Sequence, residues 1–158
     1  MSAGDPMPAF SLRDQDGNPV RSDDLVGDGP VVIFFYPKDE TAGCTAEACA
    51  FRDHYETFRD AGARVYGVSR DDDASHRQFR ERHGLPFPLL TDPGGELAKL
   101  FGVPKTLGLL PGRSTYIFDE RGVLRHHFNS QFQAVKHVQE AKKVVEELAA
   151  GHDETPAP

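Results

Sequence analysis

Residues 31–51 read VVIFFYPKDETAGCTAEACAF, and this stretch decides the architecture. Its first six residues are apolar or aromatic throughout, which is typical of a strand covered on both faces. Pro37 ends the strand, and a short polar loop follows in which Gly43 permits a tight backbone. Cys44 therefore falls in the first turn of the next helix.

Strands and helices alternate along the rest of the chain. Segments of β type are residues 64–69, 88–91, 114–118 and 123–129, and helical segments are residues 44–60, 74–83, 96–101 and 133–149. A turn at residues 119–122 makes the last two strands a hairpin, and a smaller hairpin is expected within residues 10–21. Parallel pairs need crossover helices, whereas a hairpin is antiparallel. The order therefore predicts an α/β protein with a thioredoxin-like fold, a mixed central sheet flanked by helices, and an N-terminal β-hairpin extension.

The composition is that of a folded protein of ordinary size. The chain has 158 residues, of which 38% are hydrophobic, and we expect a single domain over residues 1–150. The last eight residues, GHDETPAP, are polar and rich in proline. Residues 151–158 are therefore expected to form a disordered tail.

Charge and hydropathy exclude two classes of partner. The net charge of −7 gives no field that would attract a phosphate backbone, so a nucleic acid partner is not expected. The longest apolar run has six residues, far short of the roughly 18 that span a bilayer, so no membrane partner is expected. The first ten residues hold two prolines and no basic residue, and we therefore expect a cytoplasmic location.

The chain has two cysteines, Cys44 and Cys49. Two are too few for a disulfide framework or for a thiolate zinc site, and the seven histidines show no paired ligand spacing. We therefore expect no metal and no cofactor, and we expect the histidines to be surface residues or to have their hydrogen bonds satisfied. Redox chemistry is therefore the remaining functional role for the two thiols.

Helix periodicity separates the two sulfur atoms. Every third or fourth residue from Cys44 forms an apolar stripe that should face the core, namely Cys44, Ala48, Phe51, Tyr55 and Phe58. Cys49 lies on the polar side with Arg52. On an ideal helix, residues five apart have Cα atoms roughly 8.7 Å apart, beyond the ~7 Å limit for a disulfide. A bond between Cys44 and Cys49 therefore requires the first turns of the helix to unwind.

Two interpretations of Cys44 are open from the residues alone. A free cysteine on an apolar stripe is commonly a packing residue. A position in the first turn of a helix, where unpaired N–H groups and the helix dipole favour an anion, is instead typical of a reactive thiolate. The second cysteine five residues later favours the reactive pair.

The motif Pro37-x-x-x-Thr41-x-x-Cys44 resembles the active-site motif of the peroxiredoxins. The longer stretch FYPKDETAGCTAEACAFRD, residues 35–53, is similar to the bacterioferritin comigratory protein or peroxiredoxin Q group. The similarity continues through residues 101–106 and 110–119 and covers about residues 4–150. One departure is Ala42, where many relatives have proline.

The resemblance implies a thiol peroxidase that reduces hydrogen peroxide and organic hydroperoxides. By this resemblance Cys44 is the peroxidatic thiol, and Cys49 resolves its sulfenic acid as an intramolecular disulfide that thioredoxin or a similar dithiol reduces. It assigns peroxide binding and activation to Thr41, Arg113 and the backbone N–H groups of Gly43 and Cys44. Pro37 would shield the site from water, and the protein would be a monomer. Glu47 is expected to be a first-turn partner of the helix dipole without a chemical role.

Two other functions use the same cysteine pair. A thioredoxin-like disulfide oxidoreductase fits the fold order, although it wants C-x-x-C where this chain has C-x4-C. A non-enzymatic thiol redox sensor or holdase would use the pair as a switch. Sustained catalytic turnover with peroxide distinguishes a peroxidase from both.

Overall fold

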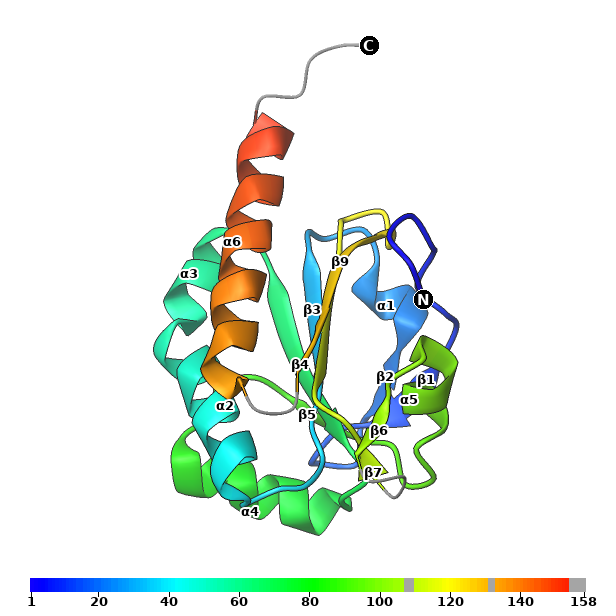
Figure 1. The fold of residues 1–158 in the computed structure, drawn as a ribbon, viewed down its shortest axis with the longest axis vertical. Coiled ribbons are helices and arrows are strands. Elements are labelled where there is room, and N and C mark those ends of the chain that lie inside the picture. The colour runs from blue at the N-terminus through cyan, green and yellow to red at the C-terminus, as the bar shows by residue number, and fades with distance from the viewer. Residues whose placement is uncertain (107–109, 131–132, 154–158) are drawn as a thin grey trace.

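The computed structural model describes residues 1–106, 110–130 and 133–153. Its centre is a seven-stranded sheet (Figure 1) with strand order β2-β1-β5-β4-β3-β8-β9. The strands are β1 (Ser11–Arg13), β2 (Pro19–Arg21), β3 (Val31–Phe35), β4 (Arg64–Ser69), β5 (Leu89–Thr91), β8 (Ser114–Phe118) and β9 (Leu124–Asn129). A separate short pair consists of β6 (Lys105–Thr106) and β7 (Leu110–Pro111). The helices are α1 (Ser22–Leu25), α2 (Ala42–Asp53), α3 (Tyr55–Asp60), α4 (Asp73–His83), α5 (Glu96–Phe101) and α6 (Ala134–Asp153).

The pairing of the strands confirms the mixed sheet. Strand β3 runs parallel to β4, and β4 runs parallel to β5, whereas β3 and β8 are antiparallel and β8 and β9 form the final hairpin. The N-terminal hairpin β1–β2 joins the sheet beside β5. Crossover helices α2, α3 and α4 connect the parallel strands, as this topology requires.

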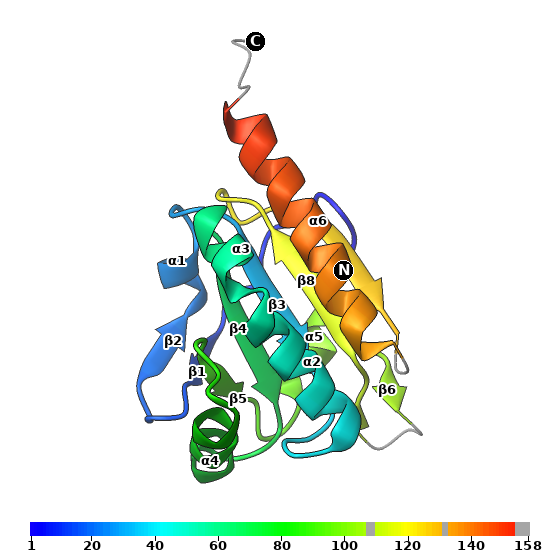
Figure 2. The same cartoon turned by 90° about the vertical axis from the view of Figure 1, so that its left-hand side faces the viewer.

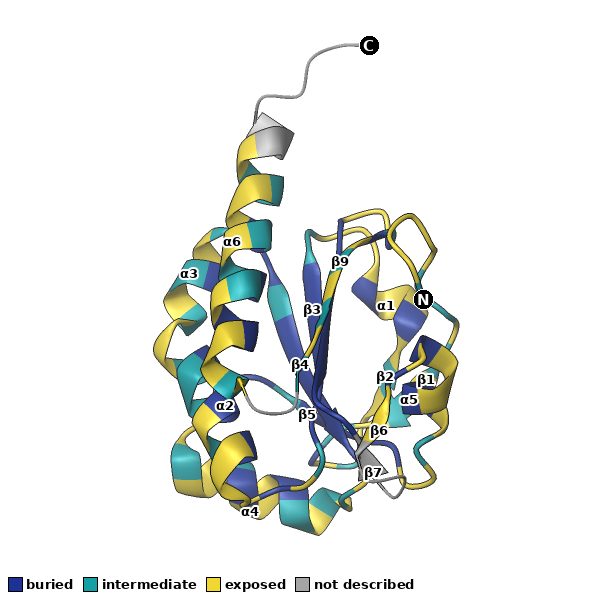
Figure 3. Ribbon diagram, in the orientation of Figure 1, coloured by how far each residue is buried: buried dark blue, intermediate teal, exposed yellow. Residues whose placement is uncertain are grey.

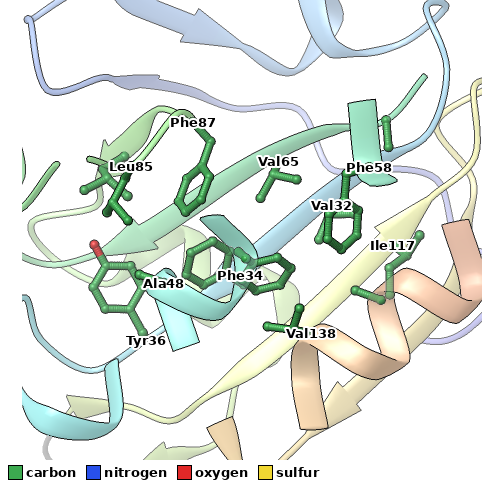
Figure 4. Close-up of a cluster of buried hydrophobic side chains, with 14 of the residues drawn as sticks. Val32, Phe34, Tyr36, Ala48, Phe58, Val65, Leu85, Phe87, Ile117 and Val138 are labelled. Carbon is green, nitrogen blue, oxygen red and sulfur yellow. The ribbon is translucent and has the colours of Figure 1, made fainter. Parts of the chain in front are cut away.

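Helices cover both faces of the sheet. Figures 1 and 2 show α2, α3 and α6 on one face, and Figure 1 shows α1 and α5 on the other. Successive side chains of a strand point to opposite faces, so β3 contributes Val32 and Phe34 to the cluster under α2 and α6, and Ile33 and Phe35 to the cluster under α5. Figure 4 shows the first of these clusters, in which Phe34 lies close to Ala48 of α2.

Burial in the sheet is nearly complete at its centre (Figure 3). All five residues of β3 and all five of β8 are buried. The helices show buried inner faces and exposed outer faces. Among the described residues no helix combines the length and the apolar character that a membrane span needs.

Three details differ from the expectation. The helix predicted over residues 44–60 is two helices, because the backbone of His54 (φ −104°, ψ 9°) leaves the α region between α2 and α3. The four-residue α1 and the two-residue β6 and β7 are too short for a periodic pattern to reveal. Helix α6 continues through Gly151 to Asp153, since glycine costs only about 1 kcal/mol in a helix interior. The rest of the expected tail, residues 154–158, lies outside the described residues.

Candidate active site

The first turn of α2 carries the sequence-predicted cysteine. Thr41 occupies the N-cap position with an extended backbone, and the first helical hydrogen bond runs from the Thr45 N–H to the Thr41 carbonyl (2.8 Å). Cys44 is the third helical residue, so its N–H is one of the groups without an acceptor inside the helix. Its side chain is 2% exposed. The predicted position of Cys44 is confirmed.

Arg113 reaches this thiol from the residue before β8. The Arg113 side chain is buried, and its Nη2 donates to Cys44 Sγ at 3.5 Å. Burial by itself lowers the pKa of Arg113, but Glu47 and Cys44 outweigh it and raise the pKa above its usual value. A permanent positive charge with an N–H donor therefore lies against the sulfur atom.

Gly43 makes this approach possible. A Cβ atom at residue 43 would lie 3.0 Å from Arg113 Nη2, tighter than ordinary van der Waals contact. A larger side chain at this position would displace the guanidinium from Cys44. The structure thus gives Gly43 a steric role next to the thiol.

Glu47 is the residue whose role was underestimated. It lies fully buried one helical turn after Cys44, and its Oε1 accepts a hydrogen bond from Arg113 Nη1 at 2.6 Å. Burial raises the pKa of Glu47 to about 8, although Arg113 opposes this shift. The expectation of a first-turn dipole partner was wrong, because α2 begins at Ala42 and Glu47 lies beyond its first turn; Glu47 instead holds the guanidinium in place. The available signal was its i+3 spacing from Cys44, which puts both on the inward face.

A buried histidine lies against the second carboxylate oxygen of Glu47. His137 Nδ1 lies 3.7 Å from Glu47 Oε2 and 2.8 Å from Thr115 Oγ1, and its Nε2 lies 2.7 Å from the Ser130 carbonyl. Because a carbonyl only accepts, Nε2 carries the hydrogen and Nδ1 of the neutral ring accepts from Thr115. Burial lowers the pKa of His137 to about 4, which keeps the ring neutral. For His137 the expectation of a satisfied histidine is confirmed.

The loop between β3 and α2 has a buried polar base. Asp39 Oδ1 accepts from the Tyr36 hydroxyl at 2.6 Å, and its Oδ2 lies 2.7 Å from His76 Nδ1 and 2.9 Å from Ser75 Oγ. His76 Nε2 faces the Leu90 carbonyl at 3.0 Å. Burial and Asp39 raise the pKa of Tyr36 well above its usual value, so the phenol remains a donor. Sequence reasoning missed this network, which no local pattern reveals.

The remaining candidates lie at the edges of the site. Thr41 is exposed, and its hydroxyl donates to the Lys38 carbonyl at 2.8 Å. Its expected contact with the sulfur or with peroxide stays a prediction. Pro37 follows β3 at the start of the same loop and is partly exposed, so its shielding role also stays a prediction.

Cys49 lies on the outer side of α2, as the periodicity predicted. It is partly exposed, whereas Cys44 is buried, and both cysteines are free thiols. Both belong to the continuous helix α2, so their Cα atoms are separated by roughly 8.7 Å, beyond disulfide reach. Any bond between them requires the turns from Cys44 to Cys49 to open.

Comparison with known proteins adds the family relationship. The model of the AhpC/TSA family matches residues 3–127. The chain is 51% identical over 149 residues to the chloroplastic peroxiredoxin Q of Oryza sativa subsp. japonica, covering 94% of this chain and 68% of that protein. It is 50% identical over 149 residues to the chloroplastic peroxiredoxin Q of Suaeda salsa, covering 94% and 69% of the two chains.

Solved structures give the same result. The peroxidoxin BcpB of Mycobacterium tuberculosis matches with a TM-score of 0.86 and 37% identity, covering 93% of this chain and 97% of that one. A peroxiredoxin Q structure from Xanthomonas campestris matches with a TM-score of 0.77 and 31% identity, covering 89% and 90%. The thioredoxin-like fold is thereby confirmed.

The same relatives correct one expectation. The cytoplasmic location predicted from the composition of the first ten residues is contradicted, because the similar curated proteins are named chloroplastic. The prediction failed because location depends on a targeting signal that transport machinery reads. The charge and hydropathy of the folded domain do not carry that information.

Proposed function

Since the chain belongs to the AhpC/TSA family, in its peroxiredoxin Q group, it is a thiol peroxidase, and we propose that Cys44 is its peroxidatic thiol and Cys49 its resolving thiol. Its substrates are peroxides, and its reductant is a thiol such as thioredoxin. The observation that carries the assignment is the contact of Arg113 Nη2 with Cys44 Sγ at 3.5 Å in the first turn of α2.

In the first step the Cys44 thiolate attacks one peroxide oxygen. The S–O bond forms as the O–O bond breaks, and the leaving hydroxide or alkoxide takes a proton to become water or an alcohol. Arg113 and the free N–H groups of the first turn of α2 stabilise the negative charge that moves from sulfur to oxygen. Thr41 and the backbone of Gly43 complete this donor set in our proposal, and Pro37 limits the access of water.

In the second step the Cys49 thiolate attacks the sulfenic sulfur of Cys44. The S–S bond forms, the S–OH bond breaks, and hydroxide leaves and takes a proton to become water. Two thiols of the external reductant then return both cysteines to the reduced state. Support for the required opening comes from the contrast between the buried Cys44 and the partly exposed Cys49 on one helix.

The test is a coupled assay in which NADPH, thioredoxin reductase and thioredoxin supply electrons to the protein in the presence of peroxide. The wild type should sustain NADPH oxidation with hydrogen peroxide and with a bulky organic hydroperoxide. Cys44→Ser should abolish it, and Cys49→Ser should consume about one peroxide per protein and then turn over poorly with thioredoxin.

Two results would contradict the proposal. Undiminished turnover of Cys49→Ser would show that Cys49 is not the resolving thiol. A wild type that is oxidised once but never turns over would instead indicate a redox sensor or holdase, and peroxide-independent disulfide reduction would indicate a disulfide oxidoreductase.

We also propose that the protein acts as a monomer. Among the described residues the exposed large apolar side chains are Val26, Leu100 and Val135. Val26 follows α1, Leu100 lies on α5 and Val135 lies on α6, and scattered single apolar side chains are normal on a monomer surface. Light scattering after size exclusion, in both redox states, should give the mass of one chain.

A further inference from the structure

The C-terminal end of α4 contacts the cysteine segment from both sides. Before Cys44, the carboxylate of Glu40 lies 2.9 Å from His83 Nε2 and 2.9 Å from Arg82 Nη1. After Cys49, Arg52 Nη1 donates to the His83 carbonyl at 2.6 Å. Two adjacent residues of α4 therefore bind both ends of the segment that contains the two thiols.

The backbone of Glu40 has an unfavourable conformation that its side-chain contacts help to maintain. Among the described residues Glu40 is the only one other than glycine with a positive φ, at 64°. This left-handed conformation is disfavoured for residues with a Cβ atom and persists where surrounding contacts impose it. Glu40 directly precedes Thr41, the N-cap of α2. Its contacts with Arg82 and His83 thus help to keep the first turn of α2 in its closed geometry.

Arg52 supplies a hydrogen-bond donor to the C-terminal end of α4. Helix α4 ends at the left-handed Gly84, and the N–H groups of Gly84 and Leu85 bind the carbonyls of Arg80 and Glu81. The carbonyl of His83, the last helical residue, has no acceptor role inside the helix. Arg52 supplies a donor to the His83 carbonyl, and His83 itself packs edge-on against the buried Phe79, with ring centroids 5.2 Å apart. The anchor point on α4 is therefore fixed to the core.

We propose that Glu40 and Arg52 are positioning residues that confine the opening of α2 to the residues between them, with α4 as the fixed support. This inference rests on the proposed function, in which Cys44 must leave its pocket to meet Cys49. The segment from Thr41 to Ala50 has enough chain for this, since ten residues span up to about 33 Å when extended. Phe51 and the helix beyond it need not move.

The two positioning residues Glu40 and Arg52, here called the anchors, should influence which of two reactions consumes the sulfenic acid of Cys44. In the closed helix it meets a second peroxide, which would oxidise it to sulfinic acid and release water or an alcohol. In the open helix Cys49 captures it as a disulfide. Anchors that favour the closed helix therefore favour the fast first step and retard capture by Cys49.

The test uses Glu40→Ala and Arg52→Met, with Glu56→Ala and Arg59→Met as matched controls. Glu56 and Arg59 form an exposed ion pair on α3 away from α4. Amide hydrogen exchange of the reduced protein should show protection at residues 42–49 lowered about three- to tenfold in Glu40→Ala and in Arg52→Met, the loss expected for one or two ion pairs or charged hydrogen bonds. The controls should match the wild type, and Arg52→Lys, which keeps a donor, should recover most of the protection.

A second readout separates positioning from general destabilisation. At high peroxide, mass spectrometry should find the sulfinic acid fraction of Cys44 lowered by a similar factor in both variants, with the urea midpoint close to that of the controls. In the oxidised Arg52→Met variant, the loss of amide protection should extend beyond residue 52. In the oxidised wild type, the loss of protection should end before residue 52.

If amide exchange of reduced Glu40→Ala and Arg52→Met equals that of the controls, the proposal that Glu40 and Arg52 restrain α2 is wrong. A wild type that forms no Cys44–Cys49 disulfide would overturn the proposed resolving step instead. The exchange of the reduced protein would still decide whether Glu40 and Arg52 restrain the helix, so the two failures are distinguishable.

Discussion

The two halves of α2 are held in place by different forces. Its first half is fixed by polar contacts, from Arg113 to Cys44 and to Glu47. Its second half is fixed by Phe51, which is fully buried and stacked on Phe34 with ring centroids 4.5 Å apart. When the first turn opens, water can replace the polar partners of Arg113 and Glu47, whereas a displaced Phe51 ring exposes apolar surface whose burial contributes about 1.5–3 kcal/mol and finds no substitute in water. The half that carries the chemistry is thus the half that can open without loss of the core.

The largest effect should come from breaking the apolar half. Phe51→Ala removes a ring from a cluster that also contains Phe58 and Phe87, so it should lower the free energy of unfolding by about 3–5 kcal/mol. Urea unfolding followed by circular dichroism measures this. Leu100→Ala, at a side chain that is 56% exposed, is the control and should change stability by less than about 1 kcal/mol. Equal losses in the two variants would show that Phe51 does not hold the helix.

The next effect should come from the polar half, and it should appear in the rate rather than in stability. Arg113→Lys keeps a positive charge beside Glu47 but lacks the planar fork that reaches Glu47 and Cys44 together. The rate constant for oxidation of Cys44 should fall about 100-fold, the usual effect of losing one oriented donor. Stopped-flow peroxide consumption measures it. Arg125→Lys, at a half-exposed arginine of β9, should react like the wild type, and a loss below about threefold in Arg113→Lys would refute the role of the fork.

The pH dependence should distinguish the two halves further. Because burial raises the pKa of Glu47 to about 8 in the closed helix, the closed form binds more protons than an open form with a carboxyl near its usual value of about 4.3. This contribution to the closed form is complete below about pH 4 and is lost as the pH rises toward 8. With these two pKa values, opening of α2 should therefore increase about 50-fold between pH 6 and pH 8.

Hydrogen exchange, expressed as protection factors that remove the intrinsic pH dependence, measures this opening. Protection at residues 44–48 should fall between pH 6 and pH 8, while protection at Phe58 of α3 should not change. In Glu47→Gln the protection of the first half should be independent of pH. A pH dependence that persists in that variant would assign the titration to another group.

The smallest effect should come from Thr41. Its hydroxyl contacts the Lys38 carbonyl, so Thr41→Val removes one neutral hydrogen bond and any donor to the peroxide. A loss of about 1 kcal/mol corresponds to a roughly fivefold slower oxidation of Cys44. Thr41→Ser should restore the rate, as measured in the same stopped-flow experiment. Equal rates for the valine and serine variants would remove the hydroxyl from the mechanism.

Much of the fold could be predicted because the decisive strands have strong local patterns. The continuous apolar run before Pro37 could be placed at the centre of the sheet, and β4 and β8 occupy the residues expected. The break at His54 could not be predicted, since the apolar stripe continues across it from Phe51 to Phe58. Periodicity reports which face is buried and does not report a local change in backbone angle.

The site could be predicted only in part for a related reason. Cys44 and Cys49 are separated by a helical period, so their opposite orientations follow from spacing. Arg113 reaches the site from a residue 69 positions away, and only the family resemblance selected it. Glu47 and His137 are buried polar residues whose partners come from other elements, and such pairings are tertiary facts that a local pattern does not contain.

The polar base beneath the loop has a further consequence for how the molecule responds to heat. Asp39 ties the end of β3 to α4, and through His76 to the carbonyl of Leu90 in β5. Surface loops ordinarily loosen long before the sheet does. This one is fastened to the interior at its midpoint, so on gradual warming it should become disordered together with the sheet rather than ahead of it.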